Sequence, residues 1–91
     1  MTGMMENGKI YLKIVSPEKT LAETHVASVS LPGKAGRFTV LKDHAPLISS
    51  LVKGEISWQD GKDTAGIHID GGFAEVLGNR VTVCAEITGK E

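Results

Sequence analysis

The chain has 91 residues, of which 41% are hydrophobic and 23% charged, and its net charge is −1. This length and composition indicate a single globular domain, residues 1–91, rather than a disordered chain. The balanced charge argues against a nucleic-acid-binding protein, which normally carries a basic excess. Residues 1–8 are polar and lack the apolar segment of a signal peptide, so we interpret them as a short flexible leader.

Short stretches of alternating or β-branched residues follow one another along the chain and predict strands. Turn signals such as Pro32-Gly33, Asp60-Gly61 and Gly78-Asn79 separate them. In chain order, the expected strands cover residues 9–15, 27–31, 37–41, 46–52, 56–59, 67–70, 73–77 and 81–85. Residues 17–22 are the one candidate for a helical turn, which we interpret as a loop or a single turn. Eight to ten strands at this close spacing predict a β-sandwich or a β-barrel.

The possible metal ligands are three histidines and one cysteine, and no two of them lie at a ligand spacing: His25, His44, His68 and Cys84. We therefore expect no metal site and no cofactor. Cys84 lies between Val83 and Ala85 on an apolar strand, which favours a small core residue. A single cysteine cannot form an internal disulfide, and this favours a reducing compartment.

Catalytic residue types are present without the motifs that would support catalysis. Asp43-His44 precedes Ser49-Ser50, but no G-x-S-x-G nucleophile motif accompanies them. Residues 33–36 are rich in glycine, but the spacing of a phosphate-binding loop fails and no helix follows. No stretch reaches the roughly 18 apolar residues of a membrane helix, so we expect no membrane insertion. These observations favour a mechanical or recognition role over an enzyme.

Three stretches are specific when they are read together: LKIVSPEK (residues 12–19), LPG with GRFTVL and HAPL (31–47), and GGFAEV with NRVTV (71–83). Their order and spacing resemble the N-terminal β-sandwich domain of the epsilon subunit of F-type ATP synthases, over residues 9–86. The resemblance implies an all-β fold, an antiparallel β-sandwich of two sheets with about ten short strands. A packed sandwich resists shear and bending, which suits a mechanical part.

The resemblance also implies a function. Such a subunit does no chemistry and works as a central-stalk (rotor) subunit of a proton- or sodium-driven enzyme, coupling the gamma subunit to the c-ring during rotation. It would be a peripheral protein on the cytoplasmic face of the bacterial inner membrane, or on the equivalent face of an energy-transducing organelle. Many members continue into two C-terminal helices that can inhibit ATP hydrolysis. This chain ends at Glu91, so we do not carry that inhibitory role over.

By resemblance, the c-ring contact would use two loop segments: Lys34, Ala35, Gly36, Arg37, Asp43 and His44. The gamma contact would use Leu21 together with one continuous segment: Ala45, Pro46, Leu47 and Ile48. Because alternate strand residues face opposite ways, only one of Leu47 and Ile48 can point outward. The position of Arg37 is often acidic or polar in relatives, and its alternative interpretation is a solvated loop charge.

Two other classes of function stay open at this point. One is a free-standing β-sandwich module that binds a ligand or a peptide, and the other is a small hydrolase. Binding of isolated ligands without motor subunits would favour the first. A catalytic triad or a metal cluster in the structure would favour the second.

Overall fold

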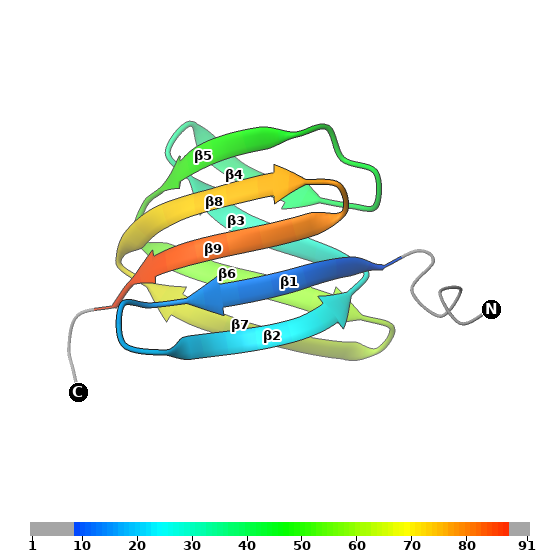
Figure 1. Ribbon diagram of the computed structural model, residues 1–91, viewed down its shortest axis with the longest axis horizontal. Helices are drawn as coiled ribbons and strands as arrows, with labels where there is room; N and C mark the ends of the chain where they lie inside the picture. Colours follow the sequence, from blue (N-terminus) through cyan, green and yellow to red (C-terminus); the bar gives the residue numbers. More distant parts are fainter. Residues whose placement is uncertain (1–8, 88–91) are drawn as a thin grey trace.

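The computed structural model describes residues 9–87, so the predicted leader at residues 1–8 lies outside the described residues. Nine strands and no helix make up this part of the chain (Figure 1). The strands are β1 (Ile10–Val15), β2 (Thr20–Val26), β3 (Ser28–Gly33), β4 (Gly36–Val40), β5 (Leu47–Leu51), β6 (Gly54–Asp60), β7 (Asp63–Ile69), β8 (Gly71–Leu77) and β9 (Arg80–Glu86).

Each of the eight expected strands is present, but β2 was not predicted. A turn at residues 16–19 leads directly into this strand, where a loop or a single helical turn was expected through residue 22. The inward positions of β2 are Ala22, Thr24 and Val26, which pair with buried residues of β1. A polar threonine in the middle of this row hides the alternation that reveals the other strands.

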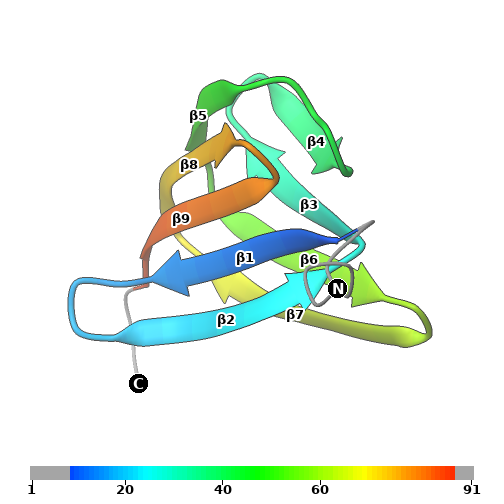
Figure 2. The same ribbon diagram turned by 45° about the vertical axis from the view of Figure 1, so that its right-hand side comes forward.

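The strands form two layers around a common core. In Figures 1 and 2, the order β2-β1-β9-β8-β5 makes one layer, and β4-β3-β6-β7 makes the other. A pairing of Gly33 in β3 with Leu51 in β5 joins the layers, so the sandwich is one curled, continuous sheet. The predicted β-sandwich is confirmed, with one difference in strand direction: β1 and β9 pair in parallel. These two strands lie far apart in sequence, so no hairpin imposes an antiparallel pairing on them.

Alternation along the strands separates the core from the surface. The buried residues of both layers are apolar, and the described residues include no buried polar or charged side chain, since the inward Thr24 is only half-buried. The largest fully buried side chains are Ile10, Leu12, Ile14, Leu31, Ile56 and Ile69. Each such side chain stabilises the fold by about 1.5–3 kcal/mol relative to an exposed position.

Unusual φ angles occur at two places in the β8–β9 hairpin, at its turn and at Gly72. Gly78 and Asn79 form the two-residue turn between β8 and β9, with φ of 58° and 62°, as a type I′ hairpin turn requires. Gly72 has a φ of 141°, and an added Cβ there would overlap the backbone carbonyl oxygen of Cys84. The close approach of β8 and β9 at this point therefore requires a residue without a side chain.

Candidate functional site

An apolar groove lies on the outer face of the sandwich where β5 meets β8. It is lined by Pro46, Leu47, Ile48, Glu75, Val76 and Leu77, and we call it the β5–β8 groove. The register pairs Leu47 with Val76 and Ile48 with Glu75, so the members of each pair share a face of the sheet. Ile48 is 76% exposed and Leu77 is 58% exposed, while Val76 belongs to the core. Large apolar side chains this exposed on one face are typical of a docking surface.

A second apolar groove lies at the other end of the same layer. Its lining residues come from β1, the turn that follows it, β8 and β9: Val15, Ser16, Pro17, Gly72, Phe73, Cys84, Ala85 and Glu86. The side chain of Phe73 is 60% exposed and faces outward with Glu75 and Leu77. β8 therefore presents an outward row that links the two grooves.

The position of Cys84 corrects the sequence prediction. This residue was expected in the core, but the structure places it on the surface as an exposed free cysteine. Its neighbours Val83 and Ala85 are both buried, and strand alternation puts the residue between them on the opposite face. The apolar character of the strand was correctly recognised, but its period of two was not applied to this residue.

One polar pair lies beside the β5–β8 groove. The backbone N–H of Asp43 donates to Asn79 Oδ1 at 2.6 Å, and Asn79 Nδ2 donates to Asp43 Oδ1 at 3.1 Å. These bonds tie the connection between β4 and β5 to the turn between β8 and β9. The hydrogen bond from Asn79 and the charge of Lys42, whose Nζ is 3.5 Å away, hold the pKa of Asp43 below its ordinary value.

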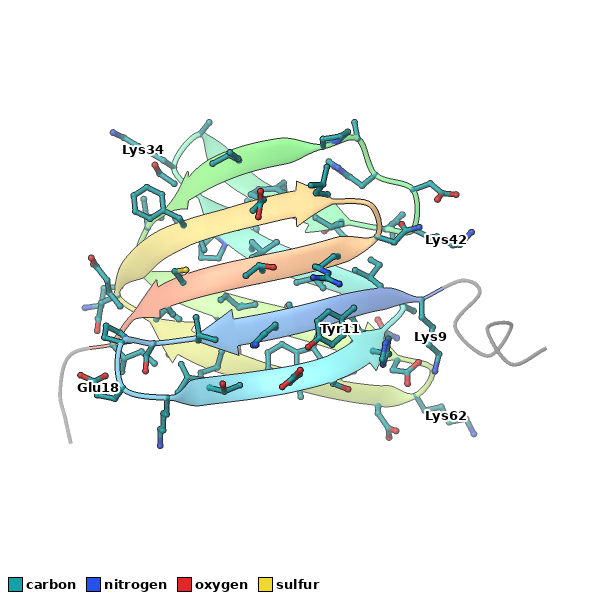
Figure 3. The ribbon with its side chains drawn as sticks, in the orientation of Figure 1. Lys9, Tyr11, Glu18, Lys34, Lys42 and Lys62 are labelled. Atoms are coloured by element: carbon teal, nitrogen blue, oxygen red, sulfur yellow. The ribbon has the colours of Figure 1, made fainter. Side chains whose placement is uncertain are left out.

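A second polar cluster lies on the outer face of β1, β2 and β9. Tyr11, labelled in Figure 3, donates its phenolic hydrogen bond to Glu23, and the Arg80 guanidinium lies 5.5 Å from the centre of its ring. The hydrogen bond to Glu23 raises the pKa of Tyr11, because it stabilises the neutral phenol. This cluster therefore strengthens the contact between β1, β2 and β9 without making a nucleophile.

Catalytic or metal-binding geometry is not found within residues 9–87. Asp43 bonds to Asn79, His44 Nδ1 lies 2.7 Å from the Ala45 carbonyl oxygen, and Ser49 Oγ donates to the Ser50 carbonyl. These partners differ from those that a Ser-His-Asp triad requires. The described residues also contain no group of three or more metal-ligating side chains and no helix that could cross a membrane.

Comparison with known proteins places this sandwich in a family. Residues 9–89 match the family model described as the ATP synthase, Delta/Epsilon chain, beta-sandwich domain. The chain belongs to this family. The resemblance that was read from the three sequence stretches is thus confirmed at the level of the delta/epsilon family.

Curated relatives of this delta/epsilon domain are named ATP synthase epsilon chain. The protein of Desulfatibacillum aliphaticivorans is 44% identical over 81 residues, which are 87% of this chain and 57% of the relative. The protein of Maridesulfovibrio salexigens is 38% identical over 82 residues, covering 90% of this chain and 58% of the relative. The chain thus spans a little over half the length of these relatives.

Solved structures show the same fold at low sequence identity. A chain of the Euglena gracilis mitochondrial ATP synthase, in an assembly of OSCP, F1 and c-ring, matches with a TM-score of 0.80 and 22% identity, over 86% of this chain and 51% of that one. A chain from the central stalk and c-ring of the Tetrahymena thermophila enzyme matches with a TM-score of 0.71 and 10% identity, over 86% and 63%. Both likenesses support the sandwich architecture of the delta/epsilon domain.

The residues predicted for the c-ring contact lie in two separate places in this delta/epsilon domain. Lys34 and Ala35 form the turn of the β3–β4 hairpin, and Gly36 and Arg37 begin β4. Asp43 and His44 follow the other end of β4, which is about 13 Å long. Figure 3 shows Lys34 and Lys42 at opposite ends of the sandwich. The structure thus separates the two predicted groups.

Arg37 lies on the surface and has a neighbour within the domain. Its Nη2 donates to Ser57 Oγ at 3.3 Å, and its side chain is exposed. This contact fits the alternative interpretation of Arg37 as a solvated charge.

The residues predicted for the gamma contact are divided in a similar way. Ala45 and Pro46 are exposed, and Pro46, Leu47 and Ile48 line the β5–β8 groove. Leu21 instead packs against the core from β2, at the opposite edge of the layer and roughly 19 Å from β5. Ile48 is the outward member of the pair, while Leu47 is half-buried and packs against the core.

Phe73 and Leu77 were missed as candidate surface residues. Both belong to the strand expected at residues 73–77, and none of its residues was assigned to an interface. The signal was available in the sequence, since Phe73, Glu75 and Leu77 alternate with the core residues Ala74 and Val76. A charged residue in the middle of such a row indicates that the row faces outward.

Proposed function

We propose that this chain is a non-catalytic central-stalk subunit of an F-type ATP synthase, which binds the gamma subunit through the β5–β8 groove. The observation that carries the proposal is the exposure of Ile48 and Leu77 in the groove. The other residues that line it belong to the stretches that resemble epsilon subunits: Pro46, Leu47, Glu75 and Val76. A few large apolar anchors at the centre of an interface usually supply most of its binding energy. Membership of the delta/epsilon family supports the same assignment.

The same proposal includes coupling to the c-ring of a proton- or sodium-driven motor, at the cytoplasmic face of a bacterial inner membrane or its organellar equivalent. The similar Tetrahymena chain comes from a central stalk and c-ring, and the similar Euglena chain comes from an assembly of OSCP, F1 and c-ring. A two-layer sandwich with a fully apolar core has the stiffness that such a connection needs. The hairpin at residues 34–37 and the connection at residues 43–44 are the two candidate ring contacts, one at each end of β4.

The gamma contact is tested with a matched pair of variants. Ile48→Asp places a carboxylate at the centre of the groove, whereas Thr64→Asp places one at an exposed β-branched position of β7, in the other layer. We expect Ile48→Asp to weaken binding of the gamma subunit by at least about a hundredfold, because a charge would be buried without a partner. Thr64→Asp should bind like the parent. Equal binding by both variants would remove the basis of the proposal.

The ring contact is tested by cross-linking within the assembled enzyme. The exposed Cys84 is first replaced by serine, and a cysteine is then introduced at Lys34 or at His44. A cross-link to subunit c from one position and not from the other would identify the end of β4 that meets the ring. If neither position cross-links while gamma binding is intact, the ring contact lies elsewhere.

The second apolar groove supports one alternative function. A free-standing binding module would take a ligand at the Phe73 side chain, on the groove that also contains Val15 and Pro17. Exposed aromatic side chains of this kind are common anchors in binding sites. Saturable binding of a peptide or small molecule that Phe73→Ser abolishes, in a protein that does not bind gamma, would favour this alternative.

A further inference from the structure

Asp43 and Asn79 connect two segments that lie 36 residues apart in the sequence. Each of the two residues is both donor and acceptor, because the backbone N–H of Asp43 and the side-chain amide of Asn79 both donate across the contact. A reciprocal pair of this kind fixes the relative position of two loops better than a single hydrogen bond. If the loops move apart, both hydrogen bonds break together and both donors are left without a partner.

Both residues also adopt an unfavourable backbone conformation. Their φ angles are 66° and 62°, and they are the non-glycine residues with positive φ in the described part of the chain. Asn and Asp tolerate this region better than other L-residues, but they still occupy it at a cost. The two connections therefore hold this geometry against a local preference, and the reciprocal hydrogen bonds offset the cost.

The pair lies directly beside the β5–β8 groove. Asp43 precedes Pro46 by three residues, and Asn79 follows Leu77 by two, so the pair links segments that contribute to both sides of the groove. Residues 42–46 belong to no strand. Besides the contact with Asn79, this connection is fixed by the His44 N–H, which donates to the Leu41 carbonyl at 3.1 Å.

We propose that Asp43 and Asn79 form a positioning clamp, which holds the Pro46 side of the groove in its binding geometry and thereby sets the affinity for the protein that docks there. This inference rests on the proposed function, in which the docking protein is the gamma subunit. Without the clamp, residues 42–46 would have to become ordered on binding. The conformational entropy lost in that step would weaken the affinity.

A charge-swap experiment tests the clamp. Asn79→Asp keeps a residue that tolerates positive φ, but it places two carboxylates against each other and removes the amide donor. Adding Asp43→Asn to that variant restores one carboxylate and one amide, in the reverse order, and returns the net charge to that of the parent. We expect Asn79→Asp to weaken binding of the gamma subunit about tenfold and the double variant to bind within about twofold of the parent.

The control for added charge is Thr64→Asp, which carries the same extra charge on the other layer. Hydrogen exchange of the Asp43 backbone amide, measured on the free protein, reports on the clamp independently of any partner. It should be faster in the single variant Asn79→Asp than in the parent, and it should return to the parent rate in the double variant. Should Asn79→Asp not fold, Asp43→Gly takes its place, since it retains the backbone donor and tolerates the positive φ, and it removes the carboxylate that accepts from Asn79 and contacts Lys42. A threefold or greater loss of affinity is expected for it.

The outcomes separate the clamp from the proposed function. Faster exchange with unchanged gamma binding would overturn the clamp, provided that Ile48→Asp still weakens binding. Failure of the double variant to restore the affinity would also overturn it. If Ile48→Asp and Asn79→Asp both leave gamma binding unchanged, the proposed function itself is wrong.

Discussion

Leu47 and Ile48 are neighbours in the sequence whose side chains face opposite sides of β5. Leu47 packs against the core cluster, while Ile48 is 76% exposed in the β5–β8 groove. The same substitution should therefore affect the stability of the fold at Leu47 and the binding of a partner at Ile48. The difference arises from strand alternation alone, because both residues are large, apolar and of similar volume.

For stability, we expect Leu47→Asp to lower the free energy of unfolding by about 3 kcal/mol, because it places a carboxylate against the core. Ile48→Asp should cost about 1 kcal/mol or less, since its side chain already meets solvent. Thermal melts of the two purified variants measure this difference. Equal melting temperatures would mean that β5 does not have the orientation described.

We expect the titration of Asp43 to make the stability of the fold depend on acid pH. Its pKa is lowered, first by the hydrogen bond from Asn79 and then by the charge of Lys42. A depressed folded-state pKa stabilises the fold above the unfolded-state pKa, and that contribution is lost as pH falls through the folded-state value. Between about pH 6 and about pH 3, the Tm of the parent should therefore fall further than the Tm of Asp43→Asn, whose residue 43 cannot titrate there. Parallel Tm curves for the two proteins would contradict this explanation.

At this scale the sequence selected three of the residues that line the groove, and their role in binding gamma stays a prediction. Pro46, Leu47 and Ile48 were selected through the family resemblance, and the structure places them together. The clamp between Asp43 and Asn79 could not be predicted, because a hydrogen bond across 36 residues leaves no trace in local patterns. Leu77 could have been selected from alternation alone.

At the scale of elements, the β8–β9 pair depends on a glycine that no other residue can replace. An added Cβ at Gly72 would overlap the Cys84 carbonyl oxygen, and φ there is 141°. Gly61 has a positive φ of 64° too, but its surroundings are open. Comparing alanine substitutions at these two positions therefore distinguishes the cost of positive φ from the cost of steric overlap.

We expect Gly72→Ala to lower the free energy of unfolding by about 3 kcal/mol or more, because β9 must move away from β8. Gly61→Ala should cost about 1–2 kcal/mol, which is the cost of positive φ for an L-residue. Urea unfolding of both variants provides the comparison. A smaller loss for Gly72→Ala than for Gly61→Ala would show that β8 and β9 approach less closely than described.

Most elements were predictable because the alternation of their side chains follows the two faces of a sandwich. β1 and β9 are clear cases, since their buried residues recur at every second position. β2 was missed because Thr24 occupies an inward position at the edge of its layer, where burial is incomplete and the pattern weakens.

At the scale of the whole molecule, the first and last described strands are neighbours within one layer. β9 lies between β1 and β8, so the layer is completed by the last strand of the described chain. The sequence predicted a sandwich, but it did not predict this pairing or the curl through Gly33 and Leu51, because both depend on contacts between distant segments.

This topology predicts slow, cooperative folding. Pairing distant strands requires closing long loops before their contacts are gained, so refolding should take milliseconds to seconds in one dominant phase. A variant truncated after Asn79 lacks β9 and should stay unfolded, because β1 and β8 then lose their shared partner. Stopped-flow fluorescence of Trp58 and circular dichroism of the truncated variant test both statements. A folded fragment would show that the two layers are stabilised independently.

The parallel pairing of β1 with β9 has a mechanical consequence. β1 begins and β9 ends at opposite ends of the sandwich (Figure 1), and five residue pairs from Tyr11–Arg80 to Val15–Cys84 join the two strands. A force that pulls Lys9 and Ile87 apart therefore runs along the strands and shears this ladder as a unit, whereas a pull across a hairpin would unzip one pair at a time. In single-molecule force spectroscopy, the domain pulled from residues 9 and 87 should rupture at a higher force than when it is pulled from residues 54 and 69, at the open end of the β6–β7 hairpin.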